Sequence, residues 1–252
     1  MIDRIKGVFS RLSAWMDDLL FPENVLCLCC DCALGEEDED GVCSGCRKAL
    51  EQLACRQEMR EAEGGEPCPP GIDDIHAAFV YEGPARKLIH RLKYESVRAA
   101  AVPLAKQMTY LPSGEEEVIV PVPTDPVRER RRGFNQAALL AEHIGKELGM
   151  SVEHALVRVS SRRPQTGLSL EERKANLSGC MQAGQSIRGK RVLLVDDVCT
   201  TGSTLAEAAG ALHQAGAKSI GVFTAARAAG GMDEAQDPFA LPVKRGRHGE
   251  KR

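Results

Sequence analysis

The thirteen residues VLLVDDVCTTGST, Val192 to Thr204, decide the fold that this sequence predicts. The apolar run at their start is typical of a strand buried on both faces of a parallel sheet. An acidic pair follows, and a short loop of small hydroxyl residues around Gly202 leads directly into a helix. Charged residues at this point of an open sheet usually face a ligand crevice, so we expect a binding site at the carboxyl end of the strand.

The loop after the strand has the composition of a phosphate site. Amides freed at a helix N-terminus and neighbouring hydroxyls can surround a phosphate, and Gly202 permits a backbone turn that a side chain would block. Asp196 and Asp197 would repel a phosphate at close range, so we expect them one sugar ring away, accepting hydrogen bonds from ribose hydroxyls. The motif therefore predicts a ribose 5-phosphate ligand. The expected phosphate contacts are Cys199, Thr200, Thr201, Gly202, Ser203 and Thr204.

Two other interpretations use the same residues. The acidic strand could belong to a P-loop nucleotide hydrolase, but the only fragment of such a loop, Gly184 to Lys190, is followed by Arg191 and enters a strand where a phosphate loop enters a helix. The hydroxyl loop could also merely cap a helix. A cap needs one hydroxyl, however, and leaves two adjacent aspartates at a strand end unexplained.

The rest of the chain supports an α/β fold. Its 252 residues are 43% hydrophobic and 27% charged, which is enough for one sizeable soluble domain and a small one. Helical and strand periods alternate from residue 72 to about 225, which predicts a parallel sheet wrapped by right-handed crossovers. Strands are expected at Val118–Val122, Arg191–Val195 and Ser219–Thr224, and helices at Ala85–Leu92, Phe134–Leu148 and Ser203–Ala215.

Four regions are predicted along the chain. Residues 1–21 carry an apolar stripe at helical spacing that charges interrupt, which predicts an amphipathic helix and excludes a transmembrane segment. This helix is expected to pack on the protein or a partner, with a membrane surface as the alternative. Residues 22–71 form a cysteine-rich, loop-rich domain that ends in a linker from Glu61 to Gly71, residues 72–228 form the α/β domain, and residues 229–252 form a disordered basic tail.

The cysteines predict a structural zinc site. Eight of the ten lie between Cys27 and Cys68, and no secretory signal precedes them, which favours a metal site in a reducing cytoplasm over disulfides. The two CxxC pairs, CLCC and CSGC, have the spacing of a tetrahedral Cys₄ zinc site. The second pair is Cys43 with Cys46, whereas the first is either Cys27 with Cys30 or Cys29 with Cys32.

A basic segment provides a second candidate anion contact. The net charge of −3 gives no global attraction to nucleic acid, so any anion-binding surface must be local. An arginine run follows the Val118 strand, and the combination of a strand end, a basic loop and a helix N-terminus suits a pyrophosphate. The expected contacts are Arg132, Gly133, Asn135 and Gln136. Lys93, at the end of an earlier helix, is either a further anion contact or a plain C-terminal helix charge.

Several motifs resemble one family. VLLVDDVCTTGSTL resembles the signature with which type I phosphoribosyltransferases bind phosphoribosyl pyrophosphate (PRPP). VPVPTDPVRERRRGFNQAALLA, RRPQTGLSLEERKANLSG and YEGPARKLIHRLKY, together with the cysteine-rich start, resemble the ComF family of competence-associated proteins. The resemblance implies the type I phosphoribosyltransferase fold, PRPP bound with Mg²⁺ that the ligand itself mainly holds, and a first zinc pair of Cys27 and Cys30. It also implies a flap from Arg162 to Asn176 that closes over PRPP with Arg163, Gln165, Thr166, Arg173 and Asn176.

The resemblance also implies a cellular role. It places the protein in the cytoplasm, or peripherally at the inner membrane, where it would handle incoming single-stranded DNA beside a helicase-like ATPase during natural competence. Two functions remain open at this point: a phosphoribosyltransferase that releases pyrophosphate to an unknown acceptor, and a non-catalytic DNA-associated adaptor with a regulatory or vestigial PRPP pocket. None of the six histidines lies within the motifs, so the sequence offers no obvious general base.

Overall fold

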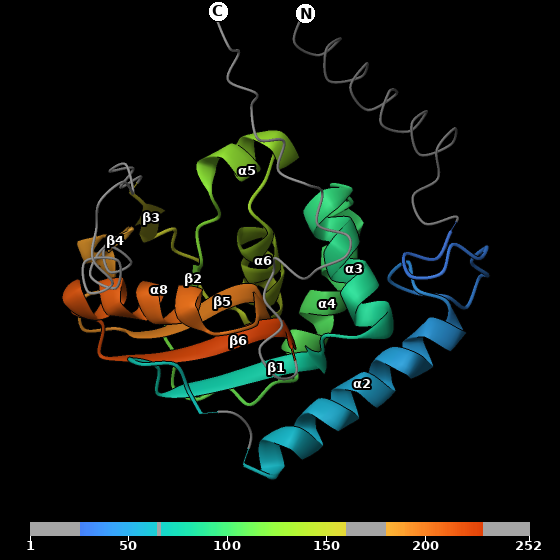
Figure 1. Ribbon diagram of the computed structural model, residues 1–252, viewed down its shortest axis with the longest axis horizontal. Coiled ribbons are helices and arrows are strands. Elements are labelled where there is room, and N and C mark those ends of the chain that lie inside the picture. The colour runs from blue at the N-terminus through green and yellow to red at the C-terminus, as the bar shows by residue number, and fades with distance from the viewer. Residues whose placement is uncertain (1–25, 65–66, 160–179, 229–252) are drawn as a thin grey trace, which may run out of the picture.

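A four-stranded parallel sheet forms the centre of the computed structural model, which describes residues 26–64, 67–159 and 180–228 (Figure 1). The strand order is β1 (Asp74–Val80), β6 (Ser219–Arg227), β5 (Arg191–Cys199) and β2 (Val118–Pro121). All three pairings are parallel, which confirms the predicted α/β fold. The expected N-terminal helix, flap and tail lie outside the described residues.

Side chains of β5 alternate between the two faces of the sheet. Val192 and Leu194 join one hydrophobic cluster with α8 (Ser203–Gln214), whereas Leu193 and Val195 join the cluster on the other face. That second cluster includes α3 (Gly83–Tyr94), α4 (Ala101–Met108, entered through the short helix η1, Arg98–Ala100) and α6 (Gln136–Leu148). The strand is therefore buried on both faces, as its apolar run predicts.

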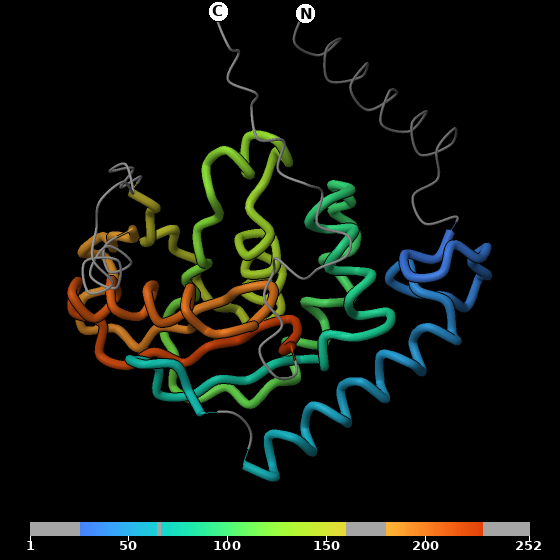
Figure 2. The backbone as a smooth tube through the Cα atoms, in the orientation of Figure 1, coloured from blue at the N-terminus to red at the C-terminus, as the bar shows by residue number. Residues whose placement is uncertain are grey.

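The chain reverses its direction of travel across the sheet between β2 and β5 (Figure 2). After β2 it passes through α6 and returns on the outer side of β2, where the Ile119 amide donates to the Ser151 carbonyl oxygen over 2.9 Å. After β5 it moves the other way, through α8 to β6. The helices that follow these two neighbouring strands thus lie on opposite faces, and such a switch point leaves a crevice at the carboxyl ends of the strands.

Smaller elements complete this half of the molecule. β3 (Leu156–Arg158) and β4 (Met181–Ala183) form an antiparallel pair, and the short helix η2 (Gln185–Ile187) leads into β5.

One predicted boundary and one predicted element type were wrong, and one strand was missed. β5 extends to Cys199, so Asp196 and Asp197 lie within the strand instead of after it, because pairing with β6 continues to its end. The expected arginine loop is a short helix, α5 (Pro126–Arg132), whose first amides are capped by the Asp125 side chain. β1 was not expected as a strand.

Part of the segment expected to be loop-rich is a nineteen-residue helix, α2 (Ser44–Ala62). It packs on β1, and its Leu50, Leu53 and Ala54 share one hydrophobic cluster with Phe79 of the sheet. The helix therefore gains burial from the α/β domain, a source that the sequence analysis did not consider. The domain boundary at residue 71 stays a prediction. Among the described residues, no helix combines the length and the apolar character needed to cross a membrane.

A polar clasp joins the end of α2 to β1. His76 lies between two carboxylates, with Nδ1 2.9 Å from Glu61 Oε2 and Nε2 2.7 Å from Asp74 Oδ2. The other Glu61 oxygen accepts hydrogen bonds from the Ala77 amide at 3.0 Å and the Gln57 side chain at 2.8 Å. The hydrogen bond to Glu61 raises the pKa of His76 against the opposing effect of burial, and Asp74 raises it further.

The clasp predicts a pH-dependent stability. A histidine whose pKa is higher in the folded than in the unfolded chain adds stability below its unfolded pKa of about 6.5, and loses it as the pH rises through the folded value. We expect His76→Gln to reduce the free energy of unfolding more at pH 6 than at pH 8, as measured by urea denaturation of both proteins. An equal reduction at the two pH values would contradict this assignment.

Candidate functional site

A cavity of about 360 Å³ opens at the carboxyl ends of β2 and β5, in the crevice at the switch point. It brings together ten of the residues that the sequence predicted for the ligand: Lys93, Arg132, Asn135, Gln136, Asp196, Asp197, Thr200, Thr201, Ser203 and Thr204. Three predicted residues, Gly133, Cys199 and Gly202, do not line the cavity, although they adjoin residues that do. The five predicted flap residues, Arg163, Gln165, Thr166, Arg173 and Asn176, lie outside the described residues.

The N-terminus of α8 faces this cavity. Its N-cap residue, Gly202, has no side chain, and the first helical amide, that of Ser203, donates to the Thr201 hydroxyl over 3.4 Å. One hydroxyl of the loop therefore caps the helix, which leaves the hydroxyls of Thr200 and Thr204 and the two aspartates without an explanation as caps. Thr201 and Ser203 place their hydroxyl oxygens 3.0 Å apart at the cavity wall. Gly202 has a φ of +70°, and an added Cβ would lie 2.5 Å from Cγ of Pro69. Glycine is required here both by the left-handed backbone and by the close approach of Pro69.

Cys199 lies behind the loop instead of in the cavity. Its side chain is buried and lines a separate hollow with Pro69 and Arg227. Cys199 is therefore not a lining residue of the cavity, and its side chain belongs to the hydrophobic cluster that includes α8.

A buried ion pair crosses the floor of the cavity. Nζ of Lys93, at the end of α3, lies 2.9 Å from Oδ1 of Asp197, and each side chain is 11% exposed. Asp196 accepts a hydrogen bond from the Asp197 amide and remains only partly buried. The two aspartates are therefore in different environments: the charge of Asp197 is neutralised within the protein, whereas Asp196 borders the open cavity.

Arg132 and Asn135 shape the opposite wall. The Arg132 guanidinium donates to Oε1 of Gln136 over 2.8 Å and lies over the ring of Tyr94. Burial holds the pKa of Arg132 below its usual range, against the effect of Asp197, but an arginine stays charged. Asn135 caps α6 through the Ala137 amide and donates to the Val122 carbonyl oxygen at 2.9 Å, so it fixes the N-terminus of α6 beside the cavity.

Two arginines of the predicted run, Arg128 and Arg132, line the cavity, and the structure adds one arginine that the sequence did not indicate. Arg128 lies one turn before Arg132 on α5, so the two side chains share the face of the helix that borders the cavity. Arg158 comes from β3, where its Nε donates to the Pro123 carbonyl oxygen at 3.2 Å, and no motif surrounds it. The described lining thus holds four cations against the three carboxylates of Asp125, Asp196 and Asp197.

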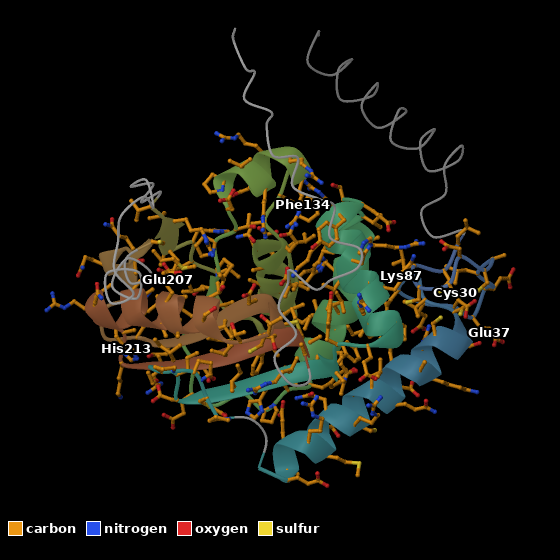
Figure 3. The ribbon with its side chains drawn as sticks, in the orientation of Figure 1. Cys30, Glu37, Lys87, Phe134, Glu207 and His213 are labelled. Carbon is orange, nitrogen blue, oxygen red and sulfur yellow. The ribbon has the colours of Figure 1, made fainter. Side chains whose placement is uncertain are left out.

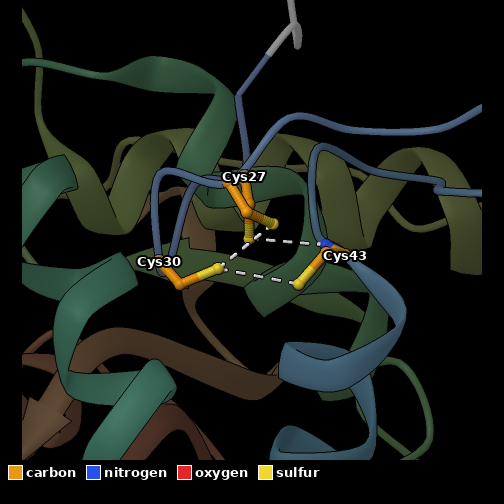
Figure 4. Close-up of side chains that lie close together, drawn as sticks. Cys27, Cys30 and Cys43 are labelled. Atoms are coloured by element: carbon orange, nitrogen blue, oxygen red, sulfur yellow. Dashed lines mark hydrogen bonds between the residues drawn. The ribbon is translucent and has the colours of Figure 1, made fainter.

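The cysteine cluster forms a second candidate site (Figure 4). The Sγ atoms of Cys27, Cys30, Cys32 and Cys43 all lie within 4.8 Å of one another, and Cys27 forms a second group with Cys29 and Cys46. The predicted set of Cys27, Cys30, Cys43 and Cys46 is thus divided, with Cys32 beside the first three and Cys46 in the second group. The predicted set and the first observed group each offer the four thiol ligands of a tetrahedral zinc site.

Cys27 is the residue common to both groups. It is fully buried, and its Sγ accepts hydrogen bonds from the Cys29 and Cys43 amides at 3.4 Å each. Burial alone would raise its pKa, but these backbone donors lower the pKa of Cys27 to about 6. A thiolate is the form that binds metal, so the local backbone prepares this cysteine as a ligand.

Comparison with known proteins identifies the family to which this chain belongs. Residues 130–240 match the phosphoribosyl transferase domain family. The DNA utilization protein YhgH of Salmonella typhi is 33% identical over 207 residues, which cover 74% of this chain and 90% of that protein. Competence protein F of Haemophilus influenzae is 32% identical over 211 residues, covering 75% and 92%. The chain belongs to the ComF family.

Another ComF relative is competence protein ComFC of Streptococcus pneumoniae, 29% identical over 216 residues that cover 83% of this chain and 91% of that protein. Among solved structures, glutamine PRPP amidotransferase from B. subtilis matches with a TM-score of 0.40 and 22% identity, over 51% of this chain and 26% of that one. ComF membership confirms the resemblance that the sequence motifs indicated, including the phosphoribosyltransferase type of domain.

The ion pair of this ComF chain predicts a specific pattern of stability. Asp197→Asn removes the carboxylate that pairs with the buried Lys93 ammonium, so we expect the free energy of unfolding to fall by about 3 kcal/mol. Adding Lys93→Met removes the stranded charge and should restore part of the loss, with a coupling energy of about 1 kcal/mol or more. Urea denaturation measures both values.

Lys87→Met is the matched control, because Lys87 lies on the same helix outside the cavity (Figure 3). Its effect should stay within about 0.5 kcal/mol. Strictly additive effects of the Lys93 and Asp197 substitutions would show that the two side chains do not interact in solution.

Proposed function

We propose that this ComF chain binds PRPP together with Mg²⁺ in the cavity between β2 and β5. One observation carries the proposal: the N-termini of α6 and α8 border the same cavity as the acidic pair near the carboxyl end of β5. Helix N-termini bind anions through free amides and the helix dipole. A ligand with a phosphate at one end, hydroxyls in the middle and a diphosphate at the other end matches that order.

Each part of the ligand has a proposed partner. The 5-phosphate lies at α8, with the hydroxyls of Thr200, Thr201, Ser203 and Thr204 around it. Asp196 and Asp197 accept hydrogen bonds from the ribose hydroxyls, which are neutral donors that a carboxylate binds well. The diphosphate lies at the N-terminus of α6, where Arg128 and Arg132 supply fixed positive charge.

The lining charges fit a ligand that brings its own cation. The positive charges of the four lining cations are nearly cancelled by the three lining carboxylates. The described residues therefore compensate little of the negative charge of a polyphosphate. Mg²⁺ commonly uses one or two carboxylates together with phosphate oxygens and water, and Asp196, which borders the cavity, is the carboxylate we assign to it. When bound, the ion would offset the charge that develops on the departing pyrophosphate.

We further propose that the ComF chain acts in DNA utilization, because its relatives carry the names competence protein F and DNA utilization protein. The described lining contains no histidine, and Asp125 and Asp197 are already engaged as a helix cap and an ion-pair partner. This observation favours a second candidate, a non-catalytic DNA-associated adaptor that senses PRPP. None of the cysteines in the described residues forms a disulfide, and we propose a reducing cytoplasm as the location of the protein.

Isothermal titration tests the pocket. We expect wild-type protein to bind PRPP with Mg²⁺, and Asp196→Asn to weaken binding at least about tenfold, since a hydrogen bond to a charged group contributes roughly 1.5–3 kcal/mol. Glu147→Gln, at the exposed end of α6, removes the same charge away from the cavity and should bind normally. Unchanged binding by Asp196→Asn, or no binding by wild type, would remove the PRPP assignment.

Turnover then separates the two functions. Pyrophosphate release from PRPP in the presence of bases, amines or nucleic acids supports a transferase, and binding without release supports the adaptor.

We also propose a structural zinc ion held by Cys27, Cys30 and Cys43, with Cys32 or Cys46 as the fourth ligand. Protein purified without chelator should contain about one zinc per chain, and Cys43→Ser should lose it together with stability. Cys55→Ser, an exposed position on α2, is the control and should keep the metal. Comparing Cys32→Ser with Cys46→Ser identifies the fourth ligand. A fully folded wild-type protein without metal would overturn the zinc proposal.

A further inference from the structure

A second hollow lies beside the proposed PRPP cavity and is not used by it. Its volume is about 500 Å³, and its apolar wall includes Phe134, Leu139 and Leu156. Four residues line both spaces, and the two hollows therefore adjoin each other: Pro123, Thr124, Asn135 and Arg158. The hollow is large enough for a planar aromatic group, and it opens directly next to the proposed ribose-phosphate site.

One wall of the hollow is an aromatic ring with a cation against it. The Arg98 guanidinium lies 4.9 Å from the ring centroid of Phe134 and donates to the Gly133 carbonyl oxygen over 3.2 Å. These contacts fix both side chains beside the C-terminal end of α5, near which Figure 3 labels Phe134. Arginine and aromatic planes are the surfaces on which unpaired bases stack.

The helix next to the hollow presents arginines to solvent. Arg128 and Arg132 of α5 line the proposed PRPP cavity, whereas Val127, Arg130 and Arg131 are exposed and, three and four residues apart, share another face of the helix. Within the part of the chain that the structure describes, neither Arg130 nor Arg131 has an ion-pair partner. The Asp125 cap holds this helix in place at its start. Two unpaired cations therefore stand beside an apolar hollow.

We propose that this surface binds single-stranded DNA, with one unpaired base in the hollow against Phe134 and the adjoining phosphates on Arg98, Arg130 and Arg131. The proposal rests on the DNA role proposed above but uses a surface separate from the PRPP cavity. The protein as a whole is acidic, with a net charge of −3, so attraction to DNA has to come from such a local cluster of cations.

The acidic residues of the hollow determine which part of the DNA enters. Glu129 and Glu142 line it together with Arg98 and Arg158, and carboxylates accept hydrogen bonds from the exocyclic amino groups of bases. A base therefore enters the hollow, and its neighbouring phosphates contact Arg98 of the lining and the two arginines outside it, Arg130 and Arg131. The bases of a duplex are already paired and stacked, so they cannot reach Phe134, and the site selects single strands.

Fluorescence anisotropy of the full zinc-containing chain tests this surface with labelled oligodeoxycytidylate. We expect Arg130→Gln/Arg131→Gln to weaken binding about tenfold and to reduce the slope of log affinity against log salt by about 1.4, because each phosphate contact on a single strand contributes about 0.7. Phe134→Leu should weaken binding at least about fivefold through lost stacking. Duplex of the same length should bind more weakly than the single strand.

Arg188→Gln/Lys218→Gln is the matched control, since it removes two positive charges from exposed positions that line neither hollow. Affinity within twofold of wild type for the Arg130/Arg131 variant, equal losses in the control, or equal binding of duplex would each overturn the proposal. Titration of the same preparations with PRPP keeps the two proposals separate. The Arg130/Arg131 variant should bind PRPP normally, and failure of PRPP binding in wild type would count against the pocket and not against the DNA surface.

Discussion

The parallel pairing of β2 with β5 is the constraint on which the candidate site depends. The register pairs Val118 with Val192 and Pro121 with Val195, so the carboxyl ends of both strands point to the same edge of the sheet, where β5 continues beyond the end of β2 to Cys199. The chain then leaves the two ends toward opposite faces, which directs the N-termini of α6 and α8 into one crevice. Neither helix alone makes a site for a ligand with two phosphate ends. The pairing of β2 with β5 sets the distance between the N-termini of α6 and α8.

The charges in the crevice illustrate how a protein can hold carboxylates where it also binds an anion. Asp197 is paired with Lys93 over 2.9 Å, and Arg132 lies close enough for Asp197 to raise its pKa. The cations thus compensate the carboxylates before any ligand arrives. Because a buried ion pair is costly to break, this arrangement also holds the Asp197 side chain in a fixed orientation beside the ribose that we propose it binds.

Much of the fold could be predicted from the sequence because its central strands are strongly apolar and its phosphate loop is compact. The helix α2 was missed, since only Leu50, Leu53, Ala54 and Gln57 of its nineteen residues are buried and its partner, β1, follows it in the chain. The helix α5 was mistaken for a loop, although Asp125 followed by Pro126 is a recognisable helix start. The pairing of Lys93 with Asp197 joins residues 104 positions apart (197 − 93), and no local pattern indicates a contact of that kind.

The close approach of Pro69 to Gly202 has an evolutionary consequence. Two independent restrictions act on position 202: the backbone is left-handed, and Pro69 occupies the space that a side chain would need. A lineage that replaced Pro69 with a smaller residue would lift only the second restriction and would still be held to glycine by the first. Drift at position 69 therefore cannot release position 202, and while Pro69 is present a substitution at position 202 must overcome both barriers in a single mutational step.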